Sequence, residues 1–183
     1  LVSLSQDVFV PELGIDISSL DAADRKHING QAIKYAYIGL SIGDLLSGLL
    51  SQLLRSRKKV INLYLAANLV LTLVFLFGMH GASIQAYNWL CLALGTATGY
   101  WGIFVTVASE QFGTNIRSTV ATTTPNFVRG AVLPITNAFK FIAVPAGNIT
   151  GALVVGLVCI GAAFWATTRI DETFHRDMDF VEN

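Results

Sequence analysis

The sequence predicts an all-α, polytopic transmembrane helix bundle of five complete spans, with the first residue outside and the last inside. Hydrophobic residues make up 53% of the chain and charged residues only 13%, whereas charged residues are roughly 25% of a soluble domain. Apolar runs of about the length that crosses a ~30 Å hydrocarbon core recur five times. Together with a mean hydropathy of +0.58, these runs identify an integral membrane protein.

Residues 43–59 determine the predicted orientation. An apolar helix rich in small residues leads here directly into Arg55, Arg57, Lys58 and Lys59. Lys and Arg beside a span are retained on the cytoplasmic side of a membrane. The first span is therefore expected to end in the cytoplasm.

Three regions follow from the apolar runs. Residues 1–32 are expected to form an extracytoplasmic loop, in which residues 1–4 would end a preceding span and Ser18 or Ser19 would cap a short helix. Residues 33–168 hold the spans 33–54, 60–78, 87–108, 120–143 and 148–168, the fourth interrupted by Pro125 and Pro134. Residues 169–183 are expected to form a cytoplasmic tail.

The basic residues agree with this topology. The proposed inner side carries Arg55, Arg57, Lys58, Lys59, Arg117, Arg169 and Arg176, whereas the outer loop carries Arg25 and Lys26. Lys34 and Lys140 lie near outer span ends, where their stems can reach the interface. Arg129 is the one basic residue well inside a span.

Small residues recur at helical spacing and predict close helix packing. Tyr37, Ser41, Asp44, Gly48 and Ser51 share a face of the first span, and Gly95, Gly99, Gly102 and Thr106 form a stripe in the third. The pairs Gly39 with Gly43 and Gly147 with Gly151 repeat the pattern. Small residues let helix backbones approach in lipid, so we expect a tightly packed bundle.

Six polar or aromatic residues inside the spans are candidates for contacting a substrate or for coupling, and Asp44 is the first of them. Inserting an acidic side chain in the middle of a span costs free energy, and such a residue usually faces a cavity or a partner. Asp44 therefore has either a functional role or a structural role, in which it hydrogen-bonds neighbouring helices. Arg129 would line a cavity with Asn126 and Asn137, or would reach the inner interface. Tyr100 and Trp101 would stack on a substrate or pack in the core.

Two inner segments carry sequence motifs. Residues 48–58, with Gly48, Ser51, Arg57 and Lys58, resemble the loop signature G-x-L-S-D-R-x-G-R-R-K of the major facilitator superfamily. Gln52 replaces the usual Asp, and Arg55 with Ser56 replaces Gly-Arg, departures typical of the weaker second copy. Residues 110–119, with Glu110 and Arg117, are similar to E-x-F-P-T-x-x-R-x-T of sugar and metabolite porters, except that Gly113 replaces Pro.

This resemblance implies helices eight to twelve of a twelve-helix transporter whose N-terminal half is missing here. Members of the family move a small solute, such as a sugar or an organic acid, by alternating access. In that scheme Arg57 or Lys58 would pair with Glu110, close to Arg117, as a cytoplasmic gate. Asp44 would be the proton carrier if coupling lies in this half, and coupling could equally lie in the other. The expected location is a bacterial cytoplasmic (inner) membrane.

Other function classes fit the sequence less well. The formal net charge is zero, so nothing indicates a nucleic-acid partner. His27, His80 and His175 are scattered and the spans hold no carboxylate pair, so no enzyme, metal site or cofactor is expected. Cys91 and Cys159 lie in apolar runs and imply no disulfide. The remaining alternative is a membrane scaffold or assembly protein that transports nothing.

Overall fold

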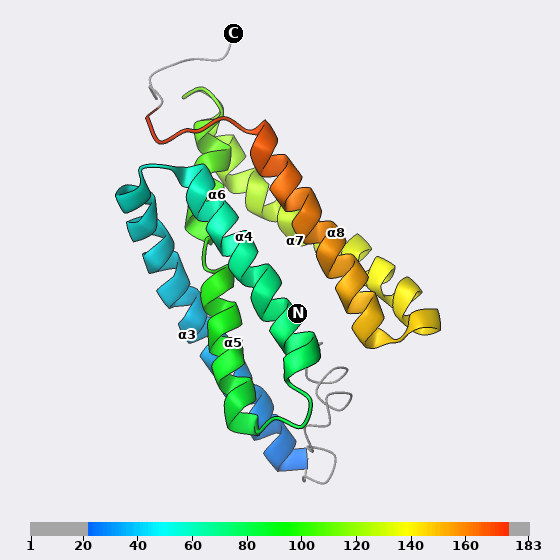
Figure 1. Cartoon of the computed structure of the whole chain (residues 1–183). Helices are drawn as coiled ribbons and strands as arrows, with labels where there is room; N and C mark the ends of the chain where they lie inside the picture. Colours follow the sequence, from blue (N-terminus) through cyan, green and yellow to red (C-terminus); the bar gives the residue numbers. More distant parts are fainter. Residues whose placement is uncertain (1–21, 176–183) are drawn as a thin grey trace.

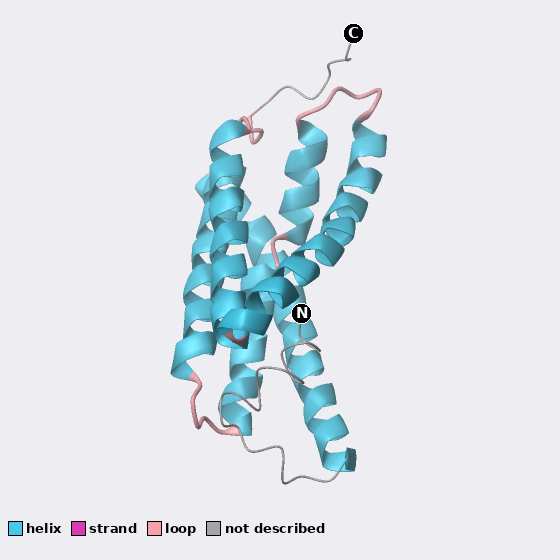
Figure 2. Cartoon of the chain, turned by 90° about the vertical axis from the view of Figure 1, so that its right-hand side faces the viewer, coloured by secondary structure: helices cyan, strands magenta, loops and turns pink. Residues whose placement is uncertain are grey.

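A computed structural model describes residues 22–175 as a bundle of helices (Figure 1). The elements are α3 (Ala22–Leu54), α4 (Arg57–Leu73), the π-helix η2 (Val74–Gly78), α5 (Ile84–Thr98), α6 (Trp101–Glu110), α7 (Arg117–Ala146) and α8 (Asn148–Arg169). Short loops join these helices, and the described residues contain no strand (Figure 2). Five helical segments are long and apolar enough to cross a membrane, which confirms the predicted number of spans.

Three boundaries differ from the prediction. Residues 22–32 belong to α3, so this part of the expected loop is helical, whereas residues 1–21 lie outside the described residues. The third span is divided into α5 and α6 around Gly99 and Tyr100. The fourth is one continuous helix, because α7 passes through both Pro125 and Pro134 without ending.

Glycines bring α3 and α5 into backbone contact. A Cβ atom added to Gly39 would lie 2.1 Å from the carbonyl oxygen of Leu92, and one added to Gly95 would lie 2.2 Å from that of Ala36. Gly43 and Gly99 meet in the same way, since a Cβ on Gly99 would lie 2.5 Å from the Cα of Gly43. Only residues without a side chain allow this approach, so the stripe predicted in the third span is a packing surface.

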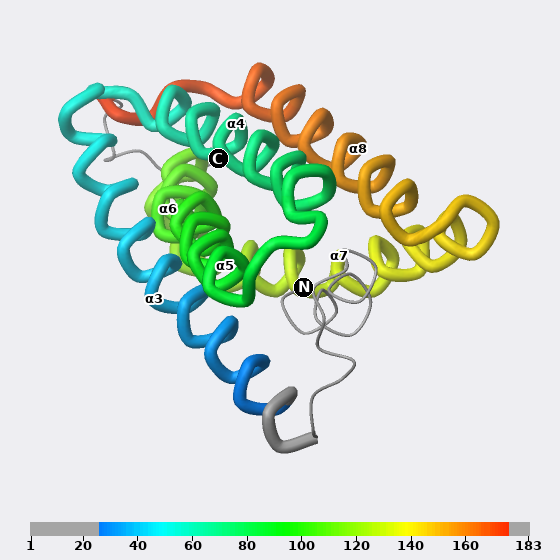
Figure 3. The backbone as a smooth tube through the Cα atoms, turned by 60° about the horizontal axis from the view of Figure 1, so that its bottom comes forward, coloured from blue at the N-terminus to red at the C-terminus, as the bar shows by residue number. Residues whose placement is uncertain are grey.

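The α5–α6 segment lies between α3 on one side and α4 on the other (Figure 3). Two buried clusters form along it, one around Leu76, Tyr87 and Cys91 and the other around Val60, Tyr64 and Ile103. α7 and α8 pack on each other, and α7 contributes no buried residue. Its apolar side chains, such as Phe127 and Phe141, are exposed to the surroundings, as lipid-facing or partner-facing residues would be.

The turn between α7 and α8 requires a glycine. Gly147 has φ +87°, a backbone conformation that side-chain-bearing residues rarely adopt. Gly151, one turn into α8, packs against Ala143, where an added Cβ would lie 3.1 Å from the Ala143 Cβ. The predicted Gly147 and Gly151 pair therefore has two separate roles, a turn and a helix contact.

Candidate functional site

A connected polar group of the described residues lies at the end of the bundle that the basic residues predict to be the inner one, where the loops after α3, α6 and α8 meet. We call it the inner cluster. Its members are Ser51, Ser56, Arg57, Lys58, Glu110, Gln111 and residues 170–173. Figure 1 shows these loops at one end of the molecule.

A bidentate ion pair is at the centre of the inner cluster. Arg57, the first residue of α4, donates from Nε and Nη2 to the two carboxylate oxygens of Glu110, the last residue of α6, each over 2.7 Å. The side chains are 18% and 10% exposed. Thr173 Oγ1 donates a third bond to Glu110 over 2.6 Å. The pair expected from the sequence is therefore present, and it is largely removed from solvent.

The segment after α8 holds the inner cluster together. Glu172 accepts hydrogen bonds from the Ser56 hydroxyl and from the backbone N–H groups of Arg57, over 2.9 Å, and Lys58, over 3.3 Å. It thus caps the N-terminus of α4, where unpaired N–H groups favour a negative charge. Lys58 Nζ donates to the carbonyl of Ile170 over 2.8 Å. Residues 170–175 of the predicted tail are therefore an ordered part of the site.

Protonation of Glu172 should weaken this cap. Burial opposes ionisation of Glu172, but the bonds from Ser56 and the backbone outweigh it and hold its pKa below the ordinary value of 4.5. Because the pKa is lower in the folded state, the stabilisation is fully present above about pH 4.5 and is lost as the pH falls further. We expect Glu172→Gln to lower the free energy of unfolding by about 0.5–1 kcal/mol near neutral pH, because Glu172 is an exposed carboxylate that caps a helix.

Thermal unfolding in detergent between pH 6 and pH 3 measures this effect. The gap in melting temperature between the wild type and Glu172→Gln should close as the pH falls. Asp171→Asn removes a neighbouring exposed carboxylate and is the matched control. Parallel curves for the wild type and Glu172→Gln over the whole range would show that the cap contributes nothing.

The other residues of the predicted gate motif occupy different environments. Ser51 is buried and its hydroxyl accepts a bond from Arg57 Nη1 over 3.3 Å, so it is part of the inner cluster. Gly48 is exposed, and a Cβ added there would meet nothing within 4 Å. Arg117 donates to the carbonyl of Phe112 within its own loop. The structure thus joins Ser51, Arg57, Lys58 and Glu110.

A second polar group lies at the break between α5 and α6. Gly102 N–H, at the start of α6, donates to Asp44 Oδ1 over 3.0 Å. The break leaves the first N–H groups of α6 without helical partners, and a carboxylate is favoured there. Sequence analysis could not predict this partner of Asp44, because the partner is the backbone N–H of Gly102. The contact fits the structural interpretation of Asp44, while its exposure leaves the carboxylate accessible.

Tyr100 and Trp101 differ in their surroundings. The Tyr100 ring lies 5.9 Å from that of Tyr64, whose hydroxyl donates to the Gly43 carbonyl over 2.8 Å. Tyr100 therefore packs within the bundle, next to the seam between α3 and α5. Trp101 is 37% exposed and its ring lies 5.8 Å from Phe104, so this side chain is available at the surface near Asp44.

The candidates on α7 are exposed. Asn126 donates to the Thr122 carbonyl of its own helix over 3.2 Å and lines a shallow groove with Phe127 and Pro134. Arg129 and Asn137 are exposed as well. Within residues 22–175 no ion pair joins Arg129 to Asp44. The structure therefore places Asp44 against Gly102, the residue after Trp101, whereas among the described residues no hydrogen bond or ion pair joins the three α7 residues to Asp44.

The fold and the two polar groups define the chain as an all-helical, multi-pass integral membrane protein with a largely buried charge pair at one end of its bundle. No protein-family model, curated protein or solved structure matches the chain.

Proposed function

We propose that this chain supplies five spans of a secondary active transporter of the major facilitator type. The transporter moves a small metabolite, such as a sugar or an organic acid, across a bacterial cytoplasmic membrane by alternating access. The remaining spans come from an N-terminal half of the same protein, and the partners are the solute, protons and the lipid bilayer. The chain acts without a cofactor and without enzymatic chemistry.

The observation that carries this proposal is the ion pair between Arg57 and Glu110. Each residue belongs to a segment that resembles a different loop motif of the same family, and the two segments are far apart in the sequence. In the structure they meet over 2.7 Å at the end of the bundle that the basic residues assign to the cytoplasm. A contact of this kind is what a cytoplasmic gate needs.

The backbone at Arg55 supports the alignment of the first motif. Arg55 has φ +48° and is the only non-glycine residue with positive φ among the described residues. This left-handed conformation costs a side-chain-bearing residue roughly 1–2 kcal/mol and suits glycine. The family motif carries Gly at this position, so the loop has the shape that the motif glycine would favour.

The divided third span supports a transport role. Broken helices at membrane depth occur where the irregular backbone is buried in protein or lines a cavity, and they bind substrates or ions in transporters. Asp44 lies ten residues before the inner end of α3, which is ~15 Å along the helix, and Arg129 lies ~18 Å along α7 from its inner end. Both are therefore near mid-membrane depth.

In this proposal the exposed side chains at that depth contact the solute. Trp101 stacks on it beside Asp44, and Asn126, Arg129 and Asn137 bind its polar or anionic groups, with Tyr100 behind them. The exposed face of α7 then borders the cavity between the two halves. Asp44 carries the coupled proton, because it is the one acidic side chain at this depth among the described residues and it is exposed.

Asp44→Asn tests the coupling role. Asn keeps an oxygen that can accept the Gly102 bond, so the fold should persist, but it cannot release a proton. We expect the variant to lose accumulation against a gradient while still exchanging solute down one. Uptake into vesicles with and without an imposed pH gradient measures both activities. If Asp44→Asn accumulates solute like the wild type, Asp44 has no part in coupling.

A further inference from the structure

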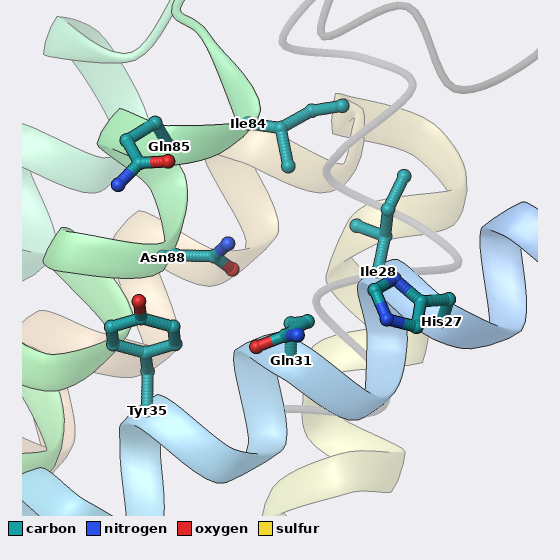
Figure 4. A pocket seen from close by; sticks show the side chains of 7 residues that line it. All are labelled: His27, Ile28, Gln31, Tyr35, Ile84, Gln85 and Asn88. Atoms are coloured by element: carbon teal, nitrogen blue, oxygen red, sulfur yellow. The ribbon is translucent and has the colours of Figure 1, made fainter.

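A small cavity lies at the end of the bundle opposite the inner cluster, between the first turns of α5 and the N-terminal part of α3. Its volume is about 260 Å³. The lining residues are His27, Ile28, Gln31 and Tyr35 from α3 with Ile84, Gln85 and Asn88 from α5. In Figure 4 the Tyr35 hydroxyl points toward α5 and the Asn88 amide points toward α3.

Asn88 carries the clearest sign of an unfilled site. Its side chain is only 8% exposed. Among the described residues, its Oδ1 atom is buried and accepts no hydrogen bond. Buried polar atoms almost always have a partner, so an unpaired one beside a cavity indicates that something outside the protein supplies the donor.

The other polar side chains of the cavity are less buried than Asn88: Gln31 and Tyr35 are half-buried, and His27 and Gln85 are exposed. His27, Gln31, Tyr35 and Gln85 make no side-chain hydrogen bond to any residue of the described part of the chain. Tyr35 is held in place by an edge-to-face contact with Trp89, whose ring lies 5.8 Å away. Five polar side chains therefore border one cavity without a hydrogen bond to a described residue, and one of them has a buried unpaired oxygen.

The chemistry of the lining selects the class of ligand. Amide side chains both donate and accept, a phenol does the same, and among the side chains that the structure describes no Asp, Glu, Lys or Arg lines the cavity. An ion would enter without a countercharge, which is unfavourable in a partly buried site. The volume lies just below the ~300–1,000 Å³ of drug-sized pockets, so the ligand is small.

We propose that this cavity binds a small neutral solute carrying several hydroxyl or amide groups. Asn88 and Gln31 hydrogen-bond the solute, and Tyr35 contacts it with its hydroxyl and ring edge. The site is separate from the residues proposed for transport, so it is a binding site in its own right at the outer end of the bundle.

Trp89 reports on the site, because it contacts Tyr35 and follows Asn88 in α5. The chain with Trp101→Phe and Trp165→Phe keeps Trp89 as its single tryptophan. We titrate this protein in detergent with glucose as the neutral probe and with glucuronate as its charged counterpart. The expected result is a saturable change in Trp89 fluorescence with glucose and none with glucuronate. Absence of saturation, or equal binding of both probes, overturns the proposal.

Two variants test the assignment of residues. Gln31→Leu should raise the half-saturating glucose concentration at least about tenfold, since a hydrogen bond to the ligand is lost. Gln52→Leu makes the same change at an exposed position of the same helix and should leave it unaltered. Equal effects of the two variants contradict the site.

Asn88→Leu adds a readout that a structural role would not give. Because Asn88 Oδ1 has no partner, an apolar replacement of similar shape should leave the melting temperature equal or higher while glucose binding weakens about tenfold. A fall in melting temperature would show that Asn88 stabilises the fold, and would overturn the proposal. Glucose binding does not depend on solute flux, so failure of this site and failure of the transport function are distinguishable.

Discussion

Gly43→Ala should destabilise the protein by about 1–3 kcal/mol or more, the cost of overpacking a close contact. The added methyl group would lie 2.2 Å from the Thr96 carbonyl oxygen and 2.9 Å from the Gly99 Cα. Both are backbone atoms, so the clash cannot be relieved by turning a side chain. Relief requires α3 and α5 to separate along the seam that forms the centre of the bundle.

Gly48→Ala is the matched control for this prediction. It makes the same change in the same helix, where the new methyl group meets nothing within 4 Å. Replacing Gly by Ala inside a helix normally stabilises it by up to about 1 kcal/mol. Thermal unfolding in detergent should therefore move in opposite directions for the two variants. Equal melting temperatures would show that the two helices do not touch at Gly43.

Glu110→Gln should both destabilise the inner cluster and lower transport. The Glu110 carboxylate is 10% exposed and accepts two bonds from Arg57 and one from Thr173. An exposed ion pair is worth only ~0–1 kcal/mol, but removing one partner of a buried pair costs up to ~3–5 kcal/mol because the other charge is left uncompensated. Gln has the shape of Glu and keeps one acceptor oxygen, so we expect the free energy of unfolding to fall by about 2–3 kcal/mol.

A double-mutant cycle with Arg57→Gln isolates the pair. If the two side chains act together, the double variant should be more stable than the sum of the single effects predicts, by at least ~1 kcal/mol. Glu172→Gln makes the same chemical change at an exposed position of the inner cluster and should cost less. Uptake by vesicles should fall in Glu110→Gln, and unchanged stability together with full uptake would remove the pair from the gate.

Hydropathy predicted the five spans because lipid imposes one requirement on every crossing segment: enough apolar residues, with the backbone bonded internally. It could not predict that α3 begins at Ala22, because polar residues can continue a helix into water. It also suggested that Pro125 and Pro134 interrupt the fourth span. α7 continues through both, since proline removes single hydrogen bonds and a long helix retains the others.

The site was only partly predictable. The contact between Arg57 and Glu110 was expected from two motifs, and the charge pattern placed both residues on one side. No sequence motif indicated Glu172 and Thr173. They follow the end of α8, and their partners Arg57 and Glu110 are distant in the sequence. The break before Trp101 lies within a single predicted span, so the sequence did not indicate that Gly102 bonds Asp44.

Solute uptake tests the central claim most directly. The protein is reconstituted in vesicles, and radiolabelled sugars, aromatic acids and carboxylates are offered with a pH gradient. We expect saturable uptake of one of these classes, driven by the gradient and reduced in Glu110→Gln. If none enters above the level of empty vesicles although the protein is inserted in the membrane, the chain belongs to a membrane scaffold and the transport function is wrong.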